Sequence, residues 1–96
     1  MNSFDIFITD QAESDLDGIV AYLQTNWSER IKTDFLAAVS QKMQLVSTMP
    51  FMYRSSSVEA GIREGFINRF VTMYYRVSES DNRIYILSFR DNRQNR

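Results

Sequence analysis

Two kinds of apolar spacing divide the chain: helical spacing in its first half and alternation in its second. Near the N-terminus, Phe4, Ile6 and Ile8 alternate with other residues, which predicts a short strand with one buried face. Helical spacing then begins. Thr9 or Asp10 is the expected cap, because short polar side chains accept hydrogen bonds from the first free N–H groups of a helix. The apolar stripe of this helix consists of Ala12, Leu16, Ile19, Val20 and Leu23.

A second helix is predicted after a break at Trp27, with Ser28 as its cap. Pro50 ends this helix at or before Met49, because proline disfavours helical backbone in the residue that precedes it. The two helices are joined by a short loop and should form an antiparallel hairpin. The apolar stripe of the second helix consists of Ile31, Phe35, Ala38, Val39, Val46 and Met49.

From Gly61 onwards, apolar residues alternate with polar ones, as in strands with two different faces. Three strands are predicted, at Ile62–Phe66, Phe70–Val77 and Arg83–Phe89. The last two are joined by Ser78–Asn82, whose sequence Ser-Glu-Ser-Asp-Asn is rich in turn-forming residues.

The serine-rich segment Phe51–Ala60 separates the helices from these strands and predicts a loosely held loop. The resulting order, β-α-α-β-β-β, predicts an α+β fold in which the helical hairpin packs on one face of a mostly antiparallel sheet. A chain of 96 residues is long enough for one hydrophobic core, so we expect a single domain over residues 1–96.

Composition excludes several kinds of chemistry. The chain has no cysteine and no histidine, which excludes disulfides, thiolate or imidazole metal sites, cysteine nucleophiles and histidine-based triads. We therefore expect no metal and no cofactor. No apolar run approaches the roughly 20 residues of a membrane span, and the N-terminus lacks the features of a signal peptide. The expected compartment is the cytoplasm, with no membrane partner.

Charge is distributed unevenly along the chain. Residues 1–53 carry seven acidic and three basic side chains, whereas residues 54–96 carry five acidic and eight basic ones. The basic half is thus suited to face nucleic acid, the ribosome or an acidic partner, although a solvated surface is the alternative. A sequence pI of about 5.3 argues against a tight, free-standing nucleic-acid binder. The basic residues of this half are all arginines: Arg54, Arg63, Arg69, Arg76, Arg83, Arg90, Arg93 and Arg96.

Five short motifs, in order, carry a resemblance to a known family. They are Ala12–Leu23 (A-x-x-D-L-x-x-I-x-x-Y), the helix end Leu45–Pro50, Gly61–Arg63 (G-x-R), Tyr74–Val77 (Y-Y-R-V) and Ile84–Leu87 (I-x-I-L). Together these motifs resemble the RelE/ParE superfamily of toxins from bacterial toxin–antitoxin operons, over essentially the whole chain. The resemblance implies the same β-α-α-β-β-β fold and a role as the toxin of a type II system.

The superfamily has two branches with different chemistry. The RelE-like branch comprises ribosome-dependent endoribonucleases that cut mRNA, and the ParE-like branch is associated with poisoning of DNA gyrase. Cleavage of RNA through the 2′-hydroxyl needs a base, an acid and cations, which family ribonucleases supply from Lys, Arg, Glu, His and a C-terminal Tyr. This chain has no histidine, no lysine after Lys42 and no tyrosine after Tyr85, so the ParE-like branch is favoured.

We therefore expect a ParE-like toxin that inhibits DNA gyrase. An mRNA endoribonuclease and an inactive antitoxin-binding module are the alternatives. If the chain is a ribonuclease, the candidate catalytic residues are Arg63, Arg76 and Arg90. Glu64, the one carboxylate in the three strands predicted after Gly61, is more typical of a salt-bridge partner. For a gyrase poison, the target-binding candidates are Arg54, Arg63, Arg90 and Arg93.

Two further expectations concern Arg76 and the partner. Arg76 lies in a strand predicted to be central, where little solvent is expected on either face, so we expect it to have a structural role. The resemblance implies a cognate antitoxin in a hetero-oligomer, with a disordered C-terminal segment that folds on the toxin as a strand or an amphipathic helix. Seven Phe, five Tyr and five Met favour such an interface, because a chain this short does not bury all of them.

Overall fold

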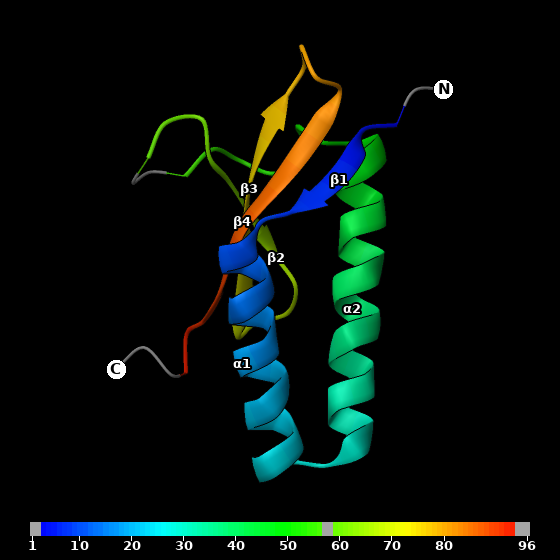
Figure 1. Ribbon diagram of the computed structural model, residues 1–96, viewed down its shortest axis with the longest axis vertical. Helices are drawn as coiled ribbons and strands as arrows, with labels where there is room; N and C mark the ends of the chain where they lie inside the picture. The colour runs from blue at the N-terminus through cyan, green and yellow to red at the C-terminus, as the bar shows by residue number, and fades with distance from the viewer. Residues whose placement is uncertain (1–2, 57–58, 94–96) are drawn as a thin grey trace.

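The fold follows the predicted order of elements. The computed structural model describes residues 3–56 and 59–93 of the chain. It contains the strand β1 (Asp5–Ile8), the helices α1 (Asp10–Asn26) and α2 (Glu29–Thr48), and the strands β2 (Arg63–Phe66), β3 (Val71–Ser78) and β4 (Arg83–Asp91) (Figure 1). The β-α-α-β-β-β order and the α+β fold class are thus confirmed. Among the described residues, no helix is long and apolar enough to cross a membrane.

The helix boundaries have local causes that were visible in the sequence. Thr9 is the N-cap of α1, and its hydroxyl accepts a hydrogen bond from the N–H of Ala12 at 3.2 Å. Ser28 caps α2 in the same way, accepting from the N–H of Ile31 at 3.2 Å. Helix α2 ends at Thr48, two residues before Pro50, as predicted.

The four strands form one sheet in the order β1-β4-β3-β2. Strand β1 runs parallel to β4, and the other two pairs are antiparallel. The register shifts between β3 and β4, because Tyr74 pairs with Ser88 while Tyr75 pairs with Ile86. Leu87 is therefore the extra residue of a β-bulge, and such bulges bend a strand and re-aim its side chains.

One face of the sheet packs against the helices and forms the core. The strand residues on this side alternate along β3 and β4, and Met73, Tyr75, Ile84 and Ile86 have no exposed surface. Residues between them, such as Arg76, point to the opposite side. We call that side the outer face of the sheet. The helices contribute to the core Ala12, Ile19, Leu23, Phe35, Val39 and Val46.

Two residues predicted for the apolar stripe of α2 are exposed instead. Ile31 is 41% exposed because the connected end of the helical hairpin projects beyond the sheet, where no strand covers it (Figure 1). Met49 is 53% exposed because it lies one residue past the helix, where the backbone leaves the helical conformation. In β1, Ile8 is also exposed, at 37%, since this strand lies at the edge of the sheet.

The segment after α2 is held more firmly than its composition suggested. The Tyr75 hydroxyl donates a hydrogen bond to the carbonyl of Pro50 at 2.8 Å. Lys42 Nζ donates to the Tyr53 hydroxyl at 2.7 Å, and Arg63 Nη1 donates to the Tyr53 carbonyl at 2.6 Å. The prediction of a loosely held loop over Phe51–Ala60 is thus wrong for residues 51–53. Residues 57–58 of the same segment lie outside the described residues.

Candidate functional site

The outer face of the sheet carries exposed arginines beside aromatic rings. Arg76 on β3 and Arg83 and Arg90 on β4 are all exposed. The Arg90 guanidinium lies 5.8 Å from the centre of the Tyr74 ring, and that of Arg83 lies 5.9 Å from the Tyr85 ring. Within residues 3–56 and 59–93, none of these three arginines forms an ion pair. Their guanidinium groups are therefore available to an anionic partner.

Tyr85 connects this arginine-bearing face to the edge strand β1. Its ring meets that of Phe7 edge to face, with centroids 5.5 Å apart, and Phe7 is 48% exposed. Tyr85 also pairs in register with Arg76 on its other side. An arginine thus lies next to aromatic rings across neighbouring strands, an arrangement that suits planar or anionic groups of a partner.

The exposure of Arg76 corrects the expectation that this residue is structural. Strand β3 is central, but the helices cover only one side of the sheet, so its alternate residues face opposite environments. Tyr75 faces the helices and is fully buried, whereas Arg76 faces solvent. The prediction was wrong because it took a central strand to be covered on both faces.

A hollow of about 200 Å³ lies on the outer face near β2. Glu64, Tyr74, Ser88 and Arg90 contribute polar groups to its lining. The Glu64 side chain is only 15% exposed, and its carboxylate lies 3.9 Å from Nη2 of Arg54. Two of the four target-binding candidates, Arg54 and Arg90, are therefore grouped around one carboxylate and one hollow.

The other two candidates, Arg63 and Arg93, are engaged in holding the fold. Arg63 donates to the Tyr53 carbonyl, and its guanidinium lies 4.9 Å from the centre of the Phe51 ring. Arg93 donates from Nε and Nη2 to the two carboxylate oxygens of Asp91, at 3.1 and 3.0 Å. The Asp91 side chain is fully buried, so this pair anchors the end of β4.

The three arginines considered for ribonuclease chemistry do not lie together. Arg63 pairs across the sheet with Tyr75, and paired residues project from the same face. Since Tyr75 faces the helices, Arg63 lies on the opposite side of the sheet from Arg76 and Arg90. Arg96, the last arginine, lies outside the described residues.

Arg83 and Tyr74 belong to this surface and were not among the predicted site residues. Arg83 has the same exposure and the same aromatic neighbourhood as Arg90. Tyr74 faces the hollow by alternation with the buried Tyr75, and the register shift brings Ser88 and Arg90 onto the same face. The arginine and tyrosine content of the strands was the available signal, but it does not identify the shared face without the register.

Comparison with solved structures shows proteins of the same fold. The chain superposes on "Chromosomal ParDE TA system from P. aeruginosa" with a TM-score of 0.76 at 16% identity, covering 93% of this chain and 96% of that chain. For the toxin–antitoxin complex RelBE2 from Mycobacterium tuberculosis, the TM-score is 0.67 at 19% identity, with 93% and 98% covered. The E. coli DinJ–YafQ complex gives a TM-score of 0.53 at 14% identity, with 95% and 96% covered.

Sequence comparison identifies the family. No curated protein sequence matches the chain. The family described as "ParE toxin of type II toxin-antitoxin system, parDE" matches residues 6–96, which include every strand and helix described above except the first residue of β1. The chain therefore belongs to the ParE toxin family of type II toxin–antitoxin systems.

Proposed function

We propose that this toxin inhibits DNA gyrase in the cytoplasm by binding it, without a catalytic step of its own, and is neutralised by a cognate antitoxin. Membership of the ParE family supports this proposal. The observation that carries it is the outer face, where Arg76, Arg83 and Arg90 are exposed and unpaired among the described residues. Arginine keeps its charge and clamps anions, but it is a poor proton shuttle.

The contact with the target is proposed to involve Arg90 first. Arg90 lines the hollow near β2, and Arg54 lies 3.9 Å from the carboxylate of Glu64, which lines the same hollow. The Arg90 guanidinium at the hollow favours recognition of carboxylates or phosphates, because it presents parallel N–H donors in a fixed fork. The Glu64 carboxylate already lies beside Arg54, so a partner must supply anionic groups of its own that compete with Glu64 for the guanidinium.

Ribonuclease activity is the second candidate, and one observation favours it. Glu64, Tyr74 and Arg90 line the same hollow, so a carboxylate, a phenol and a guanidinium converge there. In a transesterification, the carboxylate would take the proton of a 2′-hydroxyl, the phenol would protonate the departing 5′-oxygen, and the guanidinium would stabilise the charge on phosphorus. Arg54, 3.9 Å from Glu64, competes for the carboxylate that this mechanism needs.

Controlled expression in bacteria separates the candidates. Growth arrest with induction of the DNA-damage response is the result expected of a gyrase poison. Arrest with loss of mRNA and without DNA damage supports the ribonuclease, and continued growth of cells that accumulate folded protein supports the inactive antitoxin-binding module. Glu64→Gln sharpens the comparison: it abolishes ribonuclease activity, because an amide is no base, whereas a gyrase poison needs no base at this position and still arrests growth.

A further inference from the structure

Arg83 and Arg90 project from the same face of β4 although an odd number of positions separates them. Along a regular strand such residues point to opposite faces, because side chains alternate. The bulge at Leu87 supplies the extra residue that changes this: Ile86 faces the helices before the bulge, and Phe89 does so after it. The presentation of Arg90 on the outer face therefore depends on the bulge.

Without the extra residue, every side chain of β4 after Ile86 would change face. Ser88 and Arg90 would point towards the helices, and Phe89 would point to solvent, because a shift of one residue moves the whole pattern of a strand to the other side. The hollow near β2 would then lose two residues of its lining, Ser88 and Arg90. The bulge is thus a condition for the proposed contact site.

Beyond the bulge, β4 has no strand partner on the side opposite β3 among the described residues. Strand β1 pairs with Arg83–Ile86 and ends at Ile8. From Leu87 onwards, this edge of β4 lies instead beside the first turns of α1, which follows β1 directly in the chain (Figure 1). Backbone groups on this edge need partners, and side chains of α1 supply them.

Thr9 holds the chain at the start of the bulge. Its backbone N–H donates to the carbonyl of Ile86 at 3.1 Å. Its hydroxyl donates to the same carbonyl at 2.9 Å, with the carbonyl of Leu87 3.3 Å away. The oxygen of this hydroxyl also accepts from the N–H of Ala12 as the N-cap of α1. Helix α1 thus begins at a residue that is itself bonded to the bulge.

Asp15 holds the chain just after the bulge. Its Oδ2 accepts a hydrogen bond from the backbone N–H of Phe89 at 3.2 Å, and its Oδ1 accepts from Nε2 of Gln11 at 2.8 Å. Asp15 is half-buried, and the Phe89 residue is 5% exposed. The core therefore fixes the side chain of Phe89, while Asp15 fixes its backbone. A hydrogen bond to a charged group contributes more than one between neutral groups.

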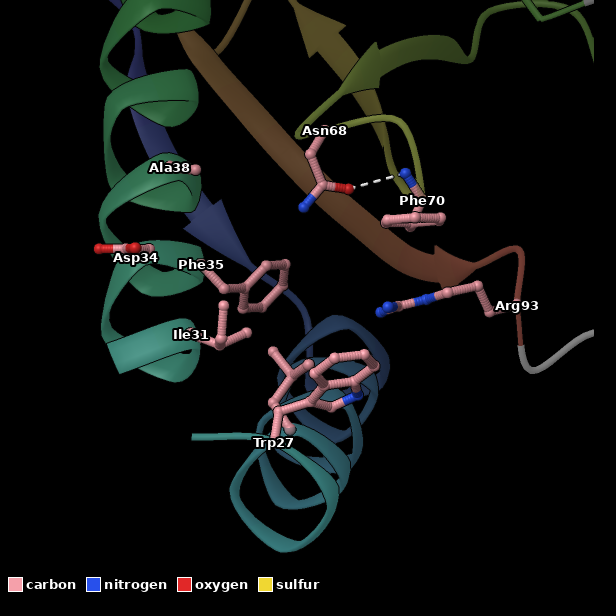
Figure 2. A pocket seen from close by; sticks show the side chains of 9 residues that line it. Trp27, Ile31, Asp34, Phe35, Ala38, Asn68, Phe70 and Arg93 are labelled. Carbon is pink, nitrogen blue, oxygen red and sulfur yellow. Dashed lines mark hydrogen bonds between the residues drawn. The ribbon is translucent and has the colours of Figure 1, made fainter. Parts of the chain in front are cut away.

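The far side of Arg90 is fixed as well. The Asp91 carboxylate is buried and bound by Arg93, and the N–H of Asn92 donates to the carbonyl of Phe70 at 2.8 Å. Figure 2 shows Arg93 just past the end of β4, directed into the hollow between the helical hairpin and the start of β3. Arg90 therefore lies between two fixed points of the strand, and α1 supplies the one at the bulge.

We propose that Asp15 is a positioning residue for the target contact: with Thr9, it holds the bulge in β4 and so presents Arg90 on the outer face. This inference rests on the proposed function, in which Arg90 contacts gyrase, and it adds the residues that place Arg90. Asp15 acts through the backbone of β4 and not by touching the target. A role in stability alone is the alternative, and it predicts losses spread over the whole sheet.

Amide hydrogen exchange measures the hold on the bulge. In Asp15→Ala we expect the N–H of Phe89 to exchange about tenfold faster, as one lost hydrogen bond to a charged group implies. Ile84, on the part of β4 that pairs with β1, is the reference and should change less than about threefold. Asp15→Asn keeps an acceptor oxygen and should restore slow exchange. Equal acceleration at Phe89 and Ile84, or none at Phe89, would overturn the proposal.

Disulfide formation reports the register, since the chain has no cysteine of its own. Tyr74 is opposite Ser88, and without the bulge it would be opposite Leu87. Directly opposite residues have Cα atoms close enough for a disulfide. With limiting oxidant, Tyr74→Cys should therefore form a disulfide faster with Ser88→Cys than with Leu87→Cys. In an Asp15→Ala background we expect the ratio of the two rates to fall about tenfold. An unchanged ratio contradicts a positioning role.

Inhibition of gyrase supercoiling tests the link to function. Asp15→Ala should lose about tenfold in potency, as expected of Arg90→Ala, and Asp15→Asn should keep the potency of the wild type. Added to Arg90→Ala, Asp15→Ala should cost nothing further, because both act through the same side chain. Fully additive losses would show that Asp15 acts independently of Arg90.

Asp17→Ala is the matched control for this series. Asp17 lies on the same helix and is exposed, and its side chain forms no hydrogen bond or ion pair within residues 3–56 and 59–93. The substitution removes the same charge and should leave both potency and the exchange of Phe89 unchanged. A loss equal to that of Asp15→Ala would mean that the charge of α1 matters and the hydrogen bond to Phe89 does not.

Two further outcomes are decisive. If Asp15→Ala does not fold, Gln11→Ala removes the exposed amide that orients the Asp15 carboxylate, and it should accelerate exchange at Phe89 more than at Ile84; equal changes there overturn the proposal. If the wild-type toxin leaves gyrase active, the proposed target is wrong, while the exchange and disulfide rates still decide whether Asp15 sets the face of Arg90. The two failures are therefore distinguishable.

Discussion

The hydroxyl of Tyr75 donates a hydrogen bond of 2.8 Å to the carbonyl of Pro50, and so joins the fully buried centre of β3 to the chain that leaves α2. The two residues are 25 positions apart in the sequence. Pro50 is buried as well, so this hydrogen bond fixes where the chain turns back towards the sheet.

Removing this hydroxyl should destabilise the protein without changing its fold. In Tyr75→Phe, the carbonyl of Pro50 loses its side-chain donor in a buried place, and we expect a loss of about 1–2 kcal/mol in the free energy of unfolding. Urea denaturation followed by far-UV circular dichroism measures this loss. Tyr85→Phe is the control, since its hydroxyl reaches only the exposed Asp81 at 3.5 Å; a loss of the same size there would contradict the account.

Tyr75 also predicts how stability responds to alkaline pH. Burial raises the pKa of the Tyr75 phenol to about 12, above its usual value of 10.0. The unfolded chain therefore loses this proton at lower pH than the folded protein does. The contribution of the neutral phenol is fully present below pH 10 and is lost as the pH rises towards 12, with a slope approaching 1.4 kcal/mol per pH unit from this one group.

The measurement is the free energy of unfolding between pH 9 and pH 12 for the wild type and Tyr75→Phe. Other tyrosines titrate in both proteins, so the difference between the two curves isolates Tyr75. We expect the curves to converge as the pH rises from 10 to 12. Parallel curves would mean that Tyr75 titrates in the folded protein as it does in the unfolded chain.

The pair formed by Asp91 and Arg93 should be strongly coupled. The Asp91 carboxylate is fully buried and accepts three hydrogen bonds from Arg93, one from its backbone N–H and two from its side chain. Arg93→Ala leaves a buried charge without its partner, and we expect a loss of about 3 kcal/mol, at the lower end of values for buried pairs because Arg93 is 28% exposed.

A double-mutant cycle measures this coupling. Asp91→Asn removes the charge that Arg93 neutralises, so adding Arg93→Ala to Asp91→Asn should cost much less than Arg93→Ala alone. Urea denaturation of the four proteins supplies the cycle. Strictly additive losses would show that the two side chains act independently.

Local sequence signals were sufficient for the elements but not for the site. Thr9, Ser28 and Pro50 set helix boundaries through their own backbone and side-chain chemistry, so they were visible in the sequence. Which face of the sheet is buried depends on the side on which the helices pack. For this reason Arg76 is exposed while its neighbour Tyr75 is buried.

Contacts between residues far apart in the sequence explain the features that local patterns did not predict. Arg54 lies beside Glu64, and Glu64 and Arg90 line the same hollow. This grouping depends on the register of β2, β3 and β4, including the shift that follows Tyr74. Ile31 matched the apolar stripe of α2, yet it is exposed because the hairpin is longer than the sheet beneath it. Neither the register nor the length of overlap is encoded in a local pattern.

The central claim is that this toxin inhibits gyrase by binding it through the outer face. The most direct test is supercoiling of relaxed plasmid by purified gyrase, titrated with wild-type toxin, Arg90→Ala and the control Arg30→Ala, whose side chain is 87% exposed on α2. We predict inhibition by the wild type and by Arg30→Ala, and a loss of potency of about tenfold or more in Arg90→Ala at an unchanged melting temperature, since a hydrogen-bonded charge contributes about 1.5–3 kcal/mol. Equal inhibition by Arg90→Ala and the wild type would contradict the assigned surface, and a wild-type toxin that leaves gyrase active at saturating concentration would contradict the claim itself.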